Sequence, residues 1–225
     1  MVKVLFCAKE RPHGEVATRR SAKPLLGGCN SHCGLMESPK ESFPKASLVF
    51  GKDLSPHDLS VINAHRFAAF RSTNPIAPTE DNEDWNKPYF IVRQGNEIVA
   101  FGRLHDVEAE FAGKKFEILG IATIVAVEKG KGNGSAITKS MTDYVQKSGK
   151  TAIGFCRPSQ SPFYEKNGFG IIPGGVRQFS FMDDGSESGP RNEDDDVIYL
   201  EGTDGLMHQL QERSTEKITV NRKTW

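Results

Sequence analysis

The stretch "IATIVAVEKGKGNGSAITKSM", residues 121–141, joins a run of apolar and β-branched residues to a loop with three glycines at alternate positions. The run extends back to Phe116, and a long, nearly all-apolar segment of this kind is typical of a central strand covered on both faces. From Ser135 onward, apolar residues recur at helical spacing as far as Gly149, which stands where a helix C-terminus is expected. The sequence therefore predicts a buried strand, a glycine loop and a helix in direct succession.

A glycine loop that opens a helix can bind phosphate, because backbone N–H groups approach an anion freely and the helix N-terminus adds partial positive charge. A Walker A loop ends in Gly-Lys followed by Ser or Thr, whereas Lys131 is followed by Gly132. A Rossmann fingerprint reads G-x-G-x-x-G, whereas Gly130, Gly132 and Gly134 give G-x-G-x-G. Both of these nucleotide-binding patterns are excluded.

The segment Lys129-Gly130-Lys131-Gly132-Asn133-Gly134 resembles the Arg/Gln-x-x-Gly-x-Gly/Ala loop of the GNAT superfamily of acetyl-CoA-dependent N-acetyltransferases, with Lys in place of the usual Arg or Gln. Downstream, "SPFYEKNGF" (161–169) is similar to that family's Phe-Tyr-x-x-x-Gly-Phe segment. The resemblance covers roughly residues 47–201. It implies a mixed α/β (α+β) fold whose mostly antiparallel central sheet is flanked by helices and holds acetyl-CoA between two splayed strands.

The resemblance also implies which residues hold acetyl-CoA. The strand end would pair its backbone with the pantetheine arm as an added strand does, and the glycine loop would hold the pyrophosphate. The strand residues are Ala122, Thr123 and Ile124, and the loop residues are Lys129, Gly130, Lys131, Gly132, Asn133, Gly134 and Ser135.

Acetyl transfer to an amine needs a proton for the leaving thiolate, and a thiol pKa of about 8.5 makes a tyrosine hydroxyl a usable acid. Tyr164, from the Phe-Tyr segment, is the expected acid. Family members often place a glutamate on the central strand, but positions 118–120 are Ile, Leu and Gly here. Glu117 is the nearest carboxylate and the candidate base, yet a one-residue offset turns a strand side chain to the other face unless a bulge restores it. His105 and Asp106 on the neighbouring strand are alternatives.

Two acidic segments and the last residue resemble, more narrowly, the aminoglycoside 2′-N-acetyltransferases: "TEDNEDW" (79–85), "RNEDDDVIYL" (191–200) and Trp225. The likeness implies a cluster of carboxylates around a small polycationic acceptor, which clustered negative charge would attract. The expected acceptor-binding residues are Glu80, Asp84, Asp195, Asp196 and Trp225. Two departures stand against it, because "LGIA" (119–122) lacks the strand acid of that family and "TVNRKTW" (219–225) is basic before the tryptophan.

The composition limits which binding partners and which cellular location are expected. Twenty-nine basic and 29 acidic residues cancel, so neither nucleic acid nor a membrane is an expected partner. The resemblance implies a small-molecule amine as the partner. Four cysteines are too few for a disulfide scaffold, which favours a cytoplasmic protein. The cluster "CNSHC" (29–33) lacks the second ligand pair of a zinc site, and Cys156, in an apolar strand, is interpreted as a core residue rather than a nucleophile.

The chain is therefore predicted to be a cytoplasmic N-acetyltransferase that uses acetyl-CoA and no metal, with homodimer formation left open. Residues 1–46 are expected to be a basic, loosely ordered extension, residues 47–201 the acetyltransferase domain, and residues 202–225 a C-terminal segment that closes the acceptor site. Two other functions stay open: acetylation of a protein or peptide amine, and CoA binding in a regulatory domain without turnover.

Overall fold

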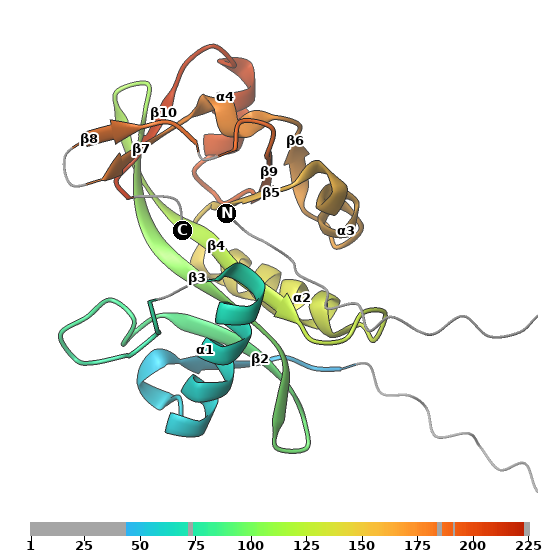
Figure 1. Cartoon of the computed structure of the whole chain (residues 1–225). Helices are drawn as coiled ribbons and strands as arrows, with labels where there is room; N and C mark the ends of the chain where they lie inside the picture. The colour runs from blue at the N-terminus through green and yellow to red at the C-terminus, as the bar shows by residue number, and fades with distance from the viewer. Residues whose placement is uncertain (1–43, 72–73, 184–185, 191, 223–225) are drawn as a thin grey trace, which may run out of the picture.

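The computed structural model describes residues 44–71, 74–183, 186–190 and 192–222 (Figure 1). Its helices are α1 (Pro56–Phe70), α2 (Asn133–Ser148), α3 (Ser161–Lys166) and α4 (Leu206–Glu212), with the short 3-10 turns η1 (Gly51–Asp53), η2 (Pro158–Gln160) and η3 (Gly175–Gln178). Its strands are β1 (Ser47–Phe50), β2 (Pro88–Gln94), β3 (Glu97–Phe111), β4 (Lys114–Ala126), β5 (Ala152–Cys156), β6 (Gly170–Ile172), β7 (Phe179–Asp183), β8 (Ser186–Ser188), β9 (Asp196–Leu200) and β10 (Ile218–Val220).

The strands form one sheet in the order β6-β9-β5-β4-β3-β10-β7-β8, and β2 joins the first half of β3 while β1 joins β2. The pairs β4–β5 and β7–β10 are parallel and the other pairs are antiparallel. The two long strands β3 and β4 connect the half of the molecule that contains α1 to the half that contains α4 (Figure 1). This mixed, mostly antiparallel sheet flanked by helices is the fold that the sequence predicts.

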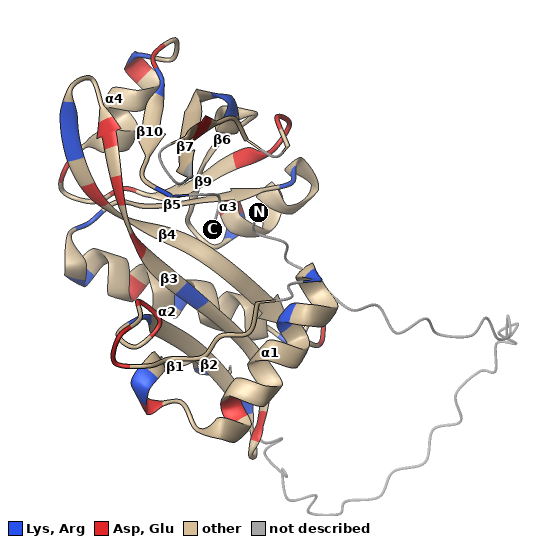
Figure 2. Ribbon diagram, turned by 60° about the vertical axis from the view of Figure 1, so that its left-hand side comes forward, with Lys and Arg blue, Asp and Glu red and all other residues tan. Residues whose placement is uncertain are grey.

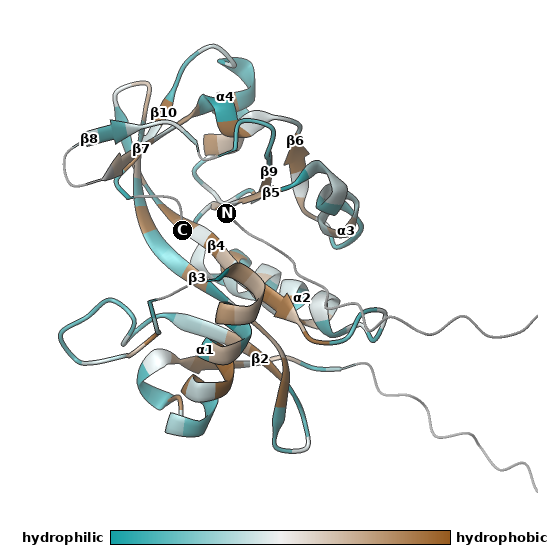
Figure 3. Ribbon diagram, in the orientation of Figure 1, coloured by the Kyte–Doolittle hydropathy of each residue, from teal (hydrophilic) through white to brown (hydrophobic). Residues whose placement is uncertain are grey.

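Three groups of buried apolar side chains hold the layers together. One lies between the sheet and α2 with α3 and includes Ile121, Ile137 and Tyr164. A second lies under α1 and includes Ile62, and a third lies under α4 and includes Leu206. In Figure 3 brown segments accordingly run along β3 and β4, interrupted by a teal stretch on β3, whereas the turns are mostly teal or white.

Local sequence signals form the elements as predicted. Helix α1 begins with a capping box, in which the Ser55 hydroxyl accepts a hydrogen bond from the Asp58 N–H and the Asp58 carboxylate accepts one from the Ser55 N–H. Gly95, with a φ of 61°, forms the turn between β2 and β3, where Gly-Asn is a common hairpin pair. Gly149 ends α2 in the left-handed conformation, with a φ of 70°. Helix α2 begins at Asn133, two residues before the predicted Ser135.

The segment after residue 201 is built into the sheet. Helix α4 buries Leu206, Met207 and Leu210, and β10 pairs with both β3 and β7. Residues 1–43 and the "CNSHC" cluster lie outside the described residues, so the predicted basic extension is seen only from residue 44 onward. No helix in the described ranges combines the length and the apolar composition that crossing a membrane requires.

The pairing of β4 with β3 shifts register opposite Gly102 of β3. Phe101 pairs with Val125 and Arg103 with Ala122, so β4 has one more residue than β3 over this interval. Thr123 takes up the extra residue in the left-handed conformation, with a φ of 53°. The result is a β-bulge, which bends the strand and changes which face the following side chains occupy.

Replacing Gly102 by Ala is expected to lower the free energy of unfolding by about 1–3 kcal/mol, the usual effect of overpacking a core. A Cβ atom at this position would lie 2.6 Å from Cε of Met141 and 2.8 Å from Cγ2 of Ile137, both on α2. Urea unfolding measures the change. The matched control is Gly189→Ala, where a Cβ meets open space, and an equal loss in both variants would contradict the packing argument.

Candidate active site

Strand β4 leaves its neighbour β5 partway along its length. The two strands pair only through Leu119 with Ala152 and Gly120 with Ile153, in the part of the chain that the structure describes. From Ile121 to Ala126, β4 keeps its pairing with β3 but has no described partner on the β5 side. An extended ligand can add to this unpaired edge as a further strand.

This open edge leads directly into the glycine loop. Gly130 and Gly132 have φ values of 74° and 75°, a conformation that favours glycine. Gly132 is the N-cap of α2, and no side chain caps the helix. Because the first turn of a helix leaves backbone N–H groups without intrahelical partners, the loop and the start of α2 can together bind an anion.

Tyr164 lies on α3, beside the place where β4 and β5 diverge. Its side chain is fully buried and its hydroxyl has no hydrogen-bond partner among the described residues. Burial, with a smaller effect from the nearby Cys156, raises the pKa of this hydroxyl well above its usual value. The hydroxyl therefore keeps its proton at neutral pH and can donate it.

His105 lies on β3, on the opposite side of the sheet from α2. It pairs across the strands with Gly120, so the imidazole stands beside a position that has no side chain of its own. Only 3% of the residue is exposed, and neither ring nitrogen has a hydrogen-bond partner within the described ranges. Burial and the charges of Arg103 and Lys87 lower its pKa well below the usual value, so the ring is neutral at pH 7.

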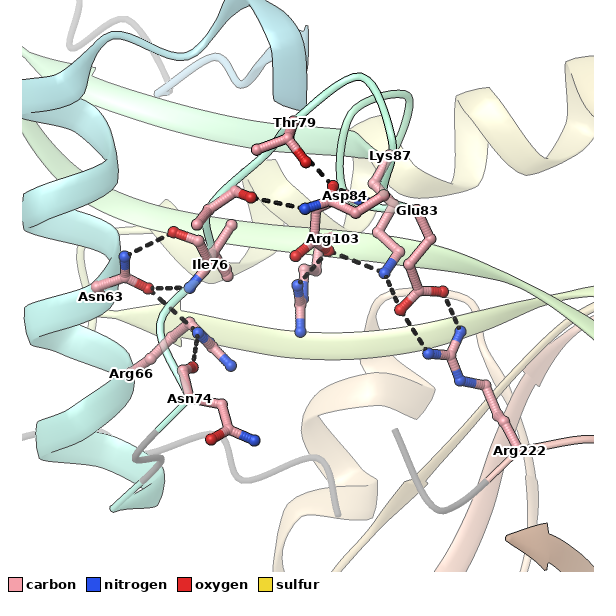
Figure 4. A network of polar contacts seen from close by, with 12 residues as sticks. Asn63, Arg66, Asn74, Ile76, Thr79, Glu83, Asp84, Lys87, Arg103 and Arg222 are labelled. Atoms are coloured by element: carbon pink, nitrogen blue, oxygen red, sulfur yellow. Dashed lines mark hydrogen bonds and ion pairs between the residues drawn. The ribbon is translucent and has the colours of Figure 1, made fainter. Parts of the chain in front are cut away.

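Cationic side chains surround the same face of β3 (Figure 4). Lys87 Nζ lies 2.7 Å from Glu83 Oε1 and 2.9 Å from Asp84 Oδ1. The same Asp84 oxygen lies 3.3 Å from Arg103 Nη1. Arg222, from the end of the described chain, makes two hydrogen bonds to the Glu83 carboxylate. We call these five residues the β3 ion cluster. In Figure 2 the red segment of the α1–β2 loop lies beside the blue segment of β3.

The loop before β2 carries three members of this cluster, Glu83, Asp84 and Lys87, and is fixed by side-chain amides. Asn63 on α1 binds both the N–H and the carbonyl of Ile76, and Asn82 accepts hydrogen bonds from the N–H groups of Thr79 and Asp84. A Cβ at Gly51 would lie 1.9 Å from the Asp84 carbonyl oxygen, so only glycine allows the loop to approach η1 this closely. Asp84 is thereby held against Lys87 and Arg103.

Glu117 on β4, the candidate base from the sequence, lies on the opposite face of the sheet from His105. Its side chain is 78% exposed, and Oε2 lies 3.0 Å from Lys150 Nζ. Asp106 contacts the same lysine at 3.4 Å and is equally exposed. The bulge at Thr123 comes after Glu117 and does not change the face that this carboxylate occupies.

The expected acceptor-binding acids lie in two separate places. Glu80 and Asp84 are on the α1–β2 loop, whereas Asp195 and Asp196 lie at the start of β9, beyond β5. The buried Asp196 accepts hydrogen bonds from the Ser161 hydroxyl at 2.5 Å and the Gly174 N–H at 2.8 Å, which ties α3 to the sheet. Trp225 lies outside the described residues. The structure thus places Asp84 alone of these residues in the β3 ion cluster.

Comparison with known proteins identifies the family. The acetyltransferase (GNAT) domain family matches residues 52–172, which is more than half of the chain. This chain belongs to the GNAT acetyltransferase family. No curated protein matches the sequence significantly.

Several solved structures are similar to this chain. Escherichia coli ElaA has 17% identity and a TM-score of 0.47, over 70% of this chain and 99% of that one. The E. coli GNAT family N-acetyltransferase YhbS, solved in complex with CoA, has 13% identity and a TM-score of 0.49, over 80% and 91%. An aminoglycoside acetyltransferase from an uncultured soil metagenomic sample has 18% identity and a TM-score of 0.43, over 56% and 88%. Such low identities and scores give no information about the acceptor.

Proposed function

We propose that this GNAT protein transfers the acetyl group of acetyl-CoA directly to a primary amine. The observation that carries the proposal is the open edge of β4, which begins where β5 diverges and ends at a glycine loop at the N-terminus of α2. Acetyl-CoA has an extended arm with amide groups at one end and a pyrophosphate at the other. The open edge fits the first part and the loop fits the second.

In this proposal the backbone of Ala122, Thr123 and Ile124 pairs with the pantetheine arm. The residues that hold the pyrophosphate are Lys129, Gly130, Lys131, Gly132, Asn133, Gly134 and Ser135. The support is that Gly130 and Gly132 adopt left-handed conformations at the start of a helix without a side-chain cap. Gly134 also allows close packing, because a Cβ there would lie 3.2 Å from the Phe163 ring of α3.

Replacing Gly132 by Ala is expected to weaken CoA binding about tenfold. A residue with a Cβ pays roughly 1–2 kcal/mol in the left-handed conformation. The free loop of the variant can relax away from this conformation, so CoA has to restore it on binding, and a tenfold change in the dissociation constant corresponds to about 1.4 kcal/mol. Isothermal titration of the protein with CoA measures the effect. The control is Gly189→Ala, and unchanged CoA affinity in the Gly132 variant would remove this loop from the proposed site.

The chemistry assigns one proton transfer to each of two residues. The amine nitrogen forms a bond to the thioester carbonyl carbon, the carbon–sulfur bond breaks, and the sulfur receives the proton of the Tyr164 hydroxyl. The proton lost by the amine is accepted by His105, the neutral and buried imidazole on β3. We favour His105 over Glu117 because the carboxylate is exposed and already paired with Lys150.

The acceptor of the sequence-based hypothesis, a small polycation similar to an aminoglycoside, stays a prediction. It relied on five residues acting together: Glu80, Asp84, Asp195, Asp196 and Trp225. Asp84 already contacts Lys87 and Arg103, and Asp196 contacts Ser161 and the Gly174 N–H. We therefore propose a primary amine without assuming that it belongs to a polycation.

Acetyl-CoA consumption, measured as free CoA with a panel of amines, tests the proposal. The panel contains aminoglycosides, polyamines, amino acids and a lysine-containing peptide. Release of CoA that depends on one of these acceptors supports an enzyme and distinguishes a small-molecule acceptor from a peptide. Tight CoA binding without acceptor-dependent release would instead support a regulatory CoA-binding domain.

A further inference from the structure

Four buried polar atoms on one face of the sheet have no hydrogen-bond partner within the described ranges: Tyr89 Oη, Arg103 Nε, and both ring nitrogens of His105. They lie close together by register, because Tyr89 on β2 pairs with Arg103 on β3 and His105 follows two residues later on the same face. Buried polar groups in native proteins are nearly always hydrogen-bonded. Four such atoms at one place indicate a binding site for a polar ligand group.

The charge around these atoms is positive. In the β3 ion cluster, three cationic side chains, Lys87, Arg103 and Arg222, face two carboxylates, Glu83 and Asp84. Lys87 is 4% exposed and the Arg103 side chain 11% exposed, so water compensates little of the surplus charge. Within the described residues, Arg103 contacts one carboxylate, at 3.3 Å, although a guanidinium has five donors.

We propose that the acceptor carries an oxyanion in addition to its amine, and that Arg103 and the Tyr89 hydroxyl bind this oxyanion while the amine lies at His105. The inference rests on the proposed acetyl transfer and specifies its substrate class. A guanidinium binds carboxylate and phosphate groups with two parallel hydrogen bonds. The ligand would also supply the negative charge that the cluster lacks.

The same charges explain why a polycationic acceptor fits this face less well. Neighbouring cations disfavour protonation of an amine, which helps to provide the neutral nucleophile. A second or third ammonium group on the acceptor would be repelled by Lys87, Arg103 and Arg222, and the two acids of the cluster, Glu83 and Asp84, already pair with these residues. An acceptor with one amine and one oxyanion avoids this repulsion.

Four amines of matched length test the proposal: pentylamine, cadaverine, aminopentanoate and aminobutyl phosphate. We expect kcat/KM for an oxyanion-bearing amine to exceed that for pentylamine by about tenfold or more, with cadaverine the poorest acceptor. The two oxyanion-bearing compounds distinguish a carboxylate from a phosphate. A preference for cadaverine, or equal values for all four, would overturn the inference while leaving acetyl transfer established.

Substitutions locate the oxyanion. Arg103→Gln is expected to lower kcat/KM for the preferred oxyanion-bearing amine by about 10- to 100-fold and to lower that for pentylamine to a much smaller extent. Tyr89→Phe removes a buried hydroxyl that lies close to Arg103 without a hydrogen bond of good geometry, so the variant should fold normally and lower the same value by about 3- to 10-fold. The control is Arg213→Gln, an exposed residue paired with Glu216. Equal losses for both kinds of amine would overturn the inference.

Equilibrium binding of aminopentanoate, aminobutyl phosphate and pentylamine to the full chain, with and without CoA, gives a result that does not depend on turnover. Tighter binding of an oxyanion-bearing amine supports the inference, and equal binding overturns it. If CoA itself fails to bind, the proposed acetyl transfer falls, and the amine measurements still decide this inference. A chain lacking residues 223–225 is measured alongside. If this deletion increased oxyanion binding, the last residues of the sequence would be competing for the site, and the proposal would be overturned.

Discussion

Replacing Tyr164 by Phe is expected to lower kcat by about 10²- to 10⁴-fold, the contribution of a well-placed general acid. The hydroxyl is fully buried, its pKa is raised, and it has no partner in the described structure, so donating its proton to a leaving thiolate is the role that its position allows. Steady-state kinetics with a saturating acceptor measures the loss. The dissociation constant for CoA should stay unchanged, because the hydroxyl contributes to neither the β4 edge nor the glycine loop.

The same substitution should leave the protein as stable as the wild type or more stable. A buried hydroxyl without a partner costs about 1–3 kcal/mol, and Phe keeps the edge-to-face contacts that the ring makes with Phe163 and Phe169. In a chain of this size a gain of 1 kcal/mol raises Tm by about 2–4 °C. Tyr144→Phe on α2 is the control and should keep full activity. A Tyr164→Phe enzyme with undiminished kcat would remove the proposed acid, and a large fall in Tm would show a structural role instead.

The fold could be predicted from the sequence wherever a local signal decides the structure. Ser55 and Pro56 start α1, Gly95 makes a hairpin turn, and Gly149 ends α2, each through a preference of its own backbone or side chain. Strand β10 has no such signal. It is three residues long, and its pairing of Val220 with Ala109 joins segments that lie far apart in the chain. Side-chain packing under α4 determines this pairing, and a sequence pattern does not show it.

The proposed catalytic face was harder to predict because it depends on strand register. The sequence shows that β4 lacks the expected glutamate, but it does not show which side chain lies there instead. That follows only from the pairing of Gly120 with His105. The bulge at Thr123 was also invisible, because non-glycine residues rarely adopt a positive φ. The positive charge beside His105 comes from Lys87, Arg103 and Arg222, three separate segments that only the tertiary structure brings together.

Replacing His105 by Gln is expected to lower kcat/KM by about 10²- to 10³-fold, within the usual range for the loss of a general base. Glutamine fills a similar volume and forms hydrogen bonds, but it cannot accept the proton of the amine at neutral pH. The wild-type rate should not fall because of this residue as the pH is lowered to 6.5, because the folded-state pKa lies well below that value and the imidazole is still neutral there. Initial rates across pH, with a fixed acceptor, measure both effects.

Stability provides a second readout for His105 that does not involve turnover. Its pKa in the folded state is lower than the unfolded value near 6.5, so the unfolded chain binds more protons once the pH falls below 6.5. The free energy of unfolding should therefore decrease as the pH falls from 6.5 toward the folded-state pKa, and this part of the decrease should disappear in the His105→Gln variant. The controls are Glu117→Gln and Asp106→Asn, which lose surface contacts with Lys150 and should keep activity within about threefold. If Glu117→Gln abolished activity while His105→Gln did not, the base would be the exposed carboxylate, and acetyl transfer would have to take place on the α2 face of β4.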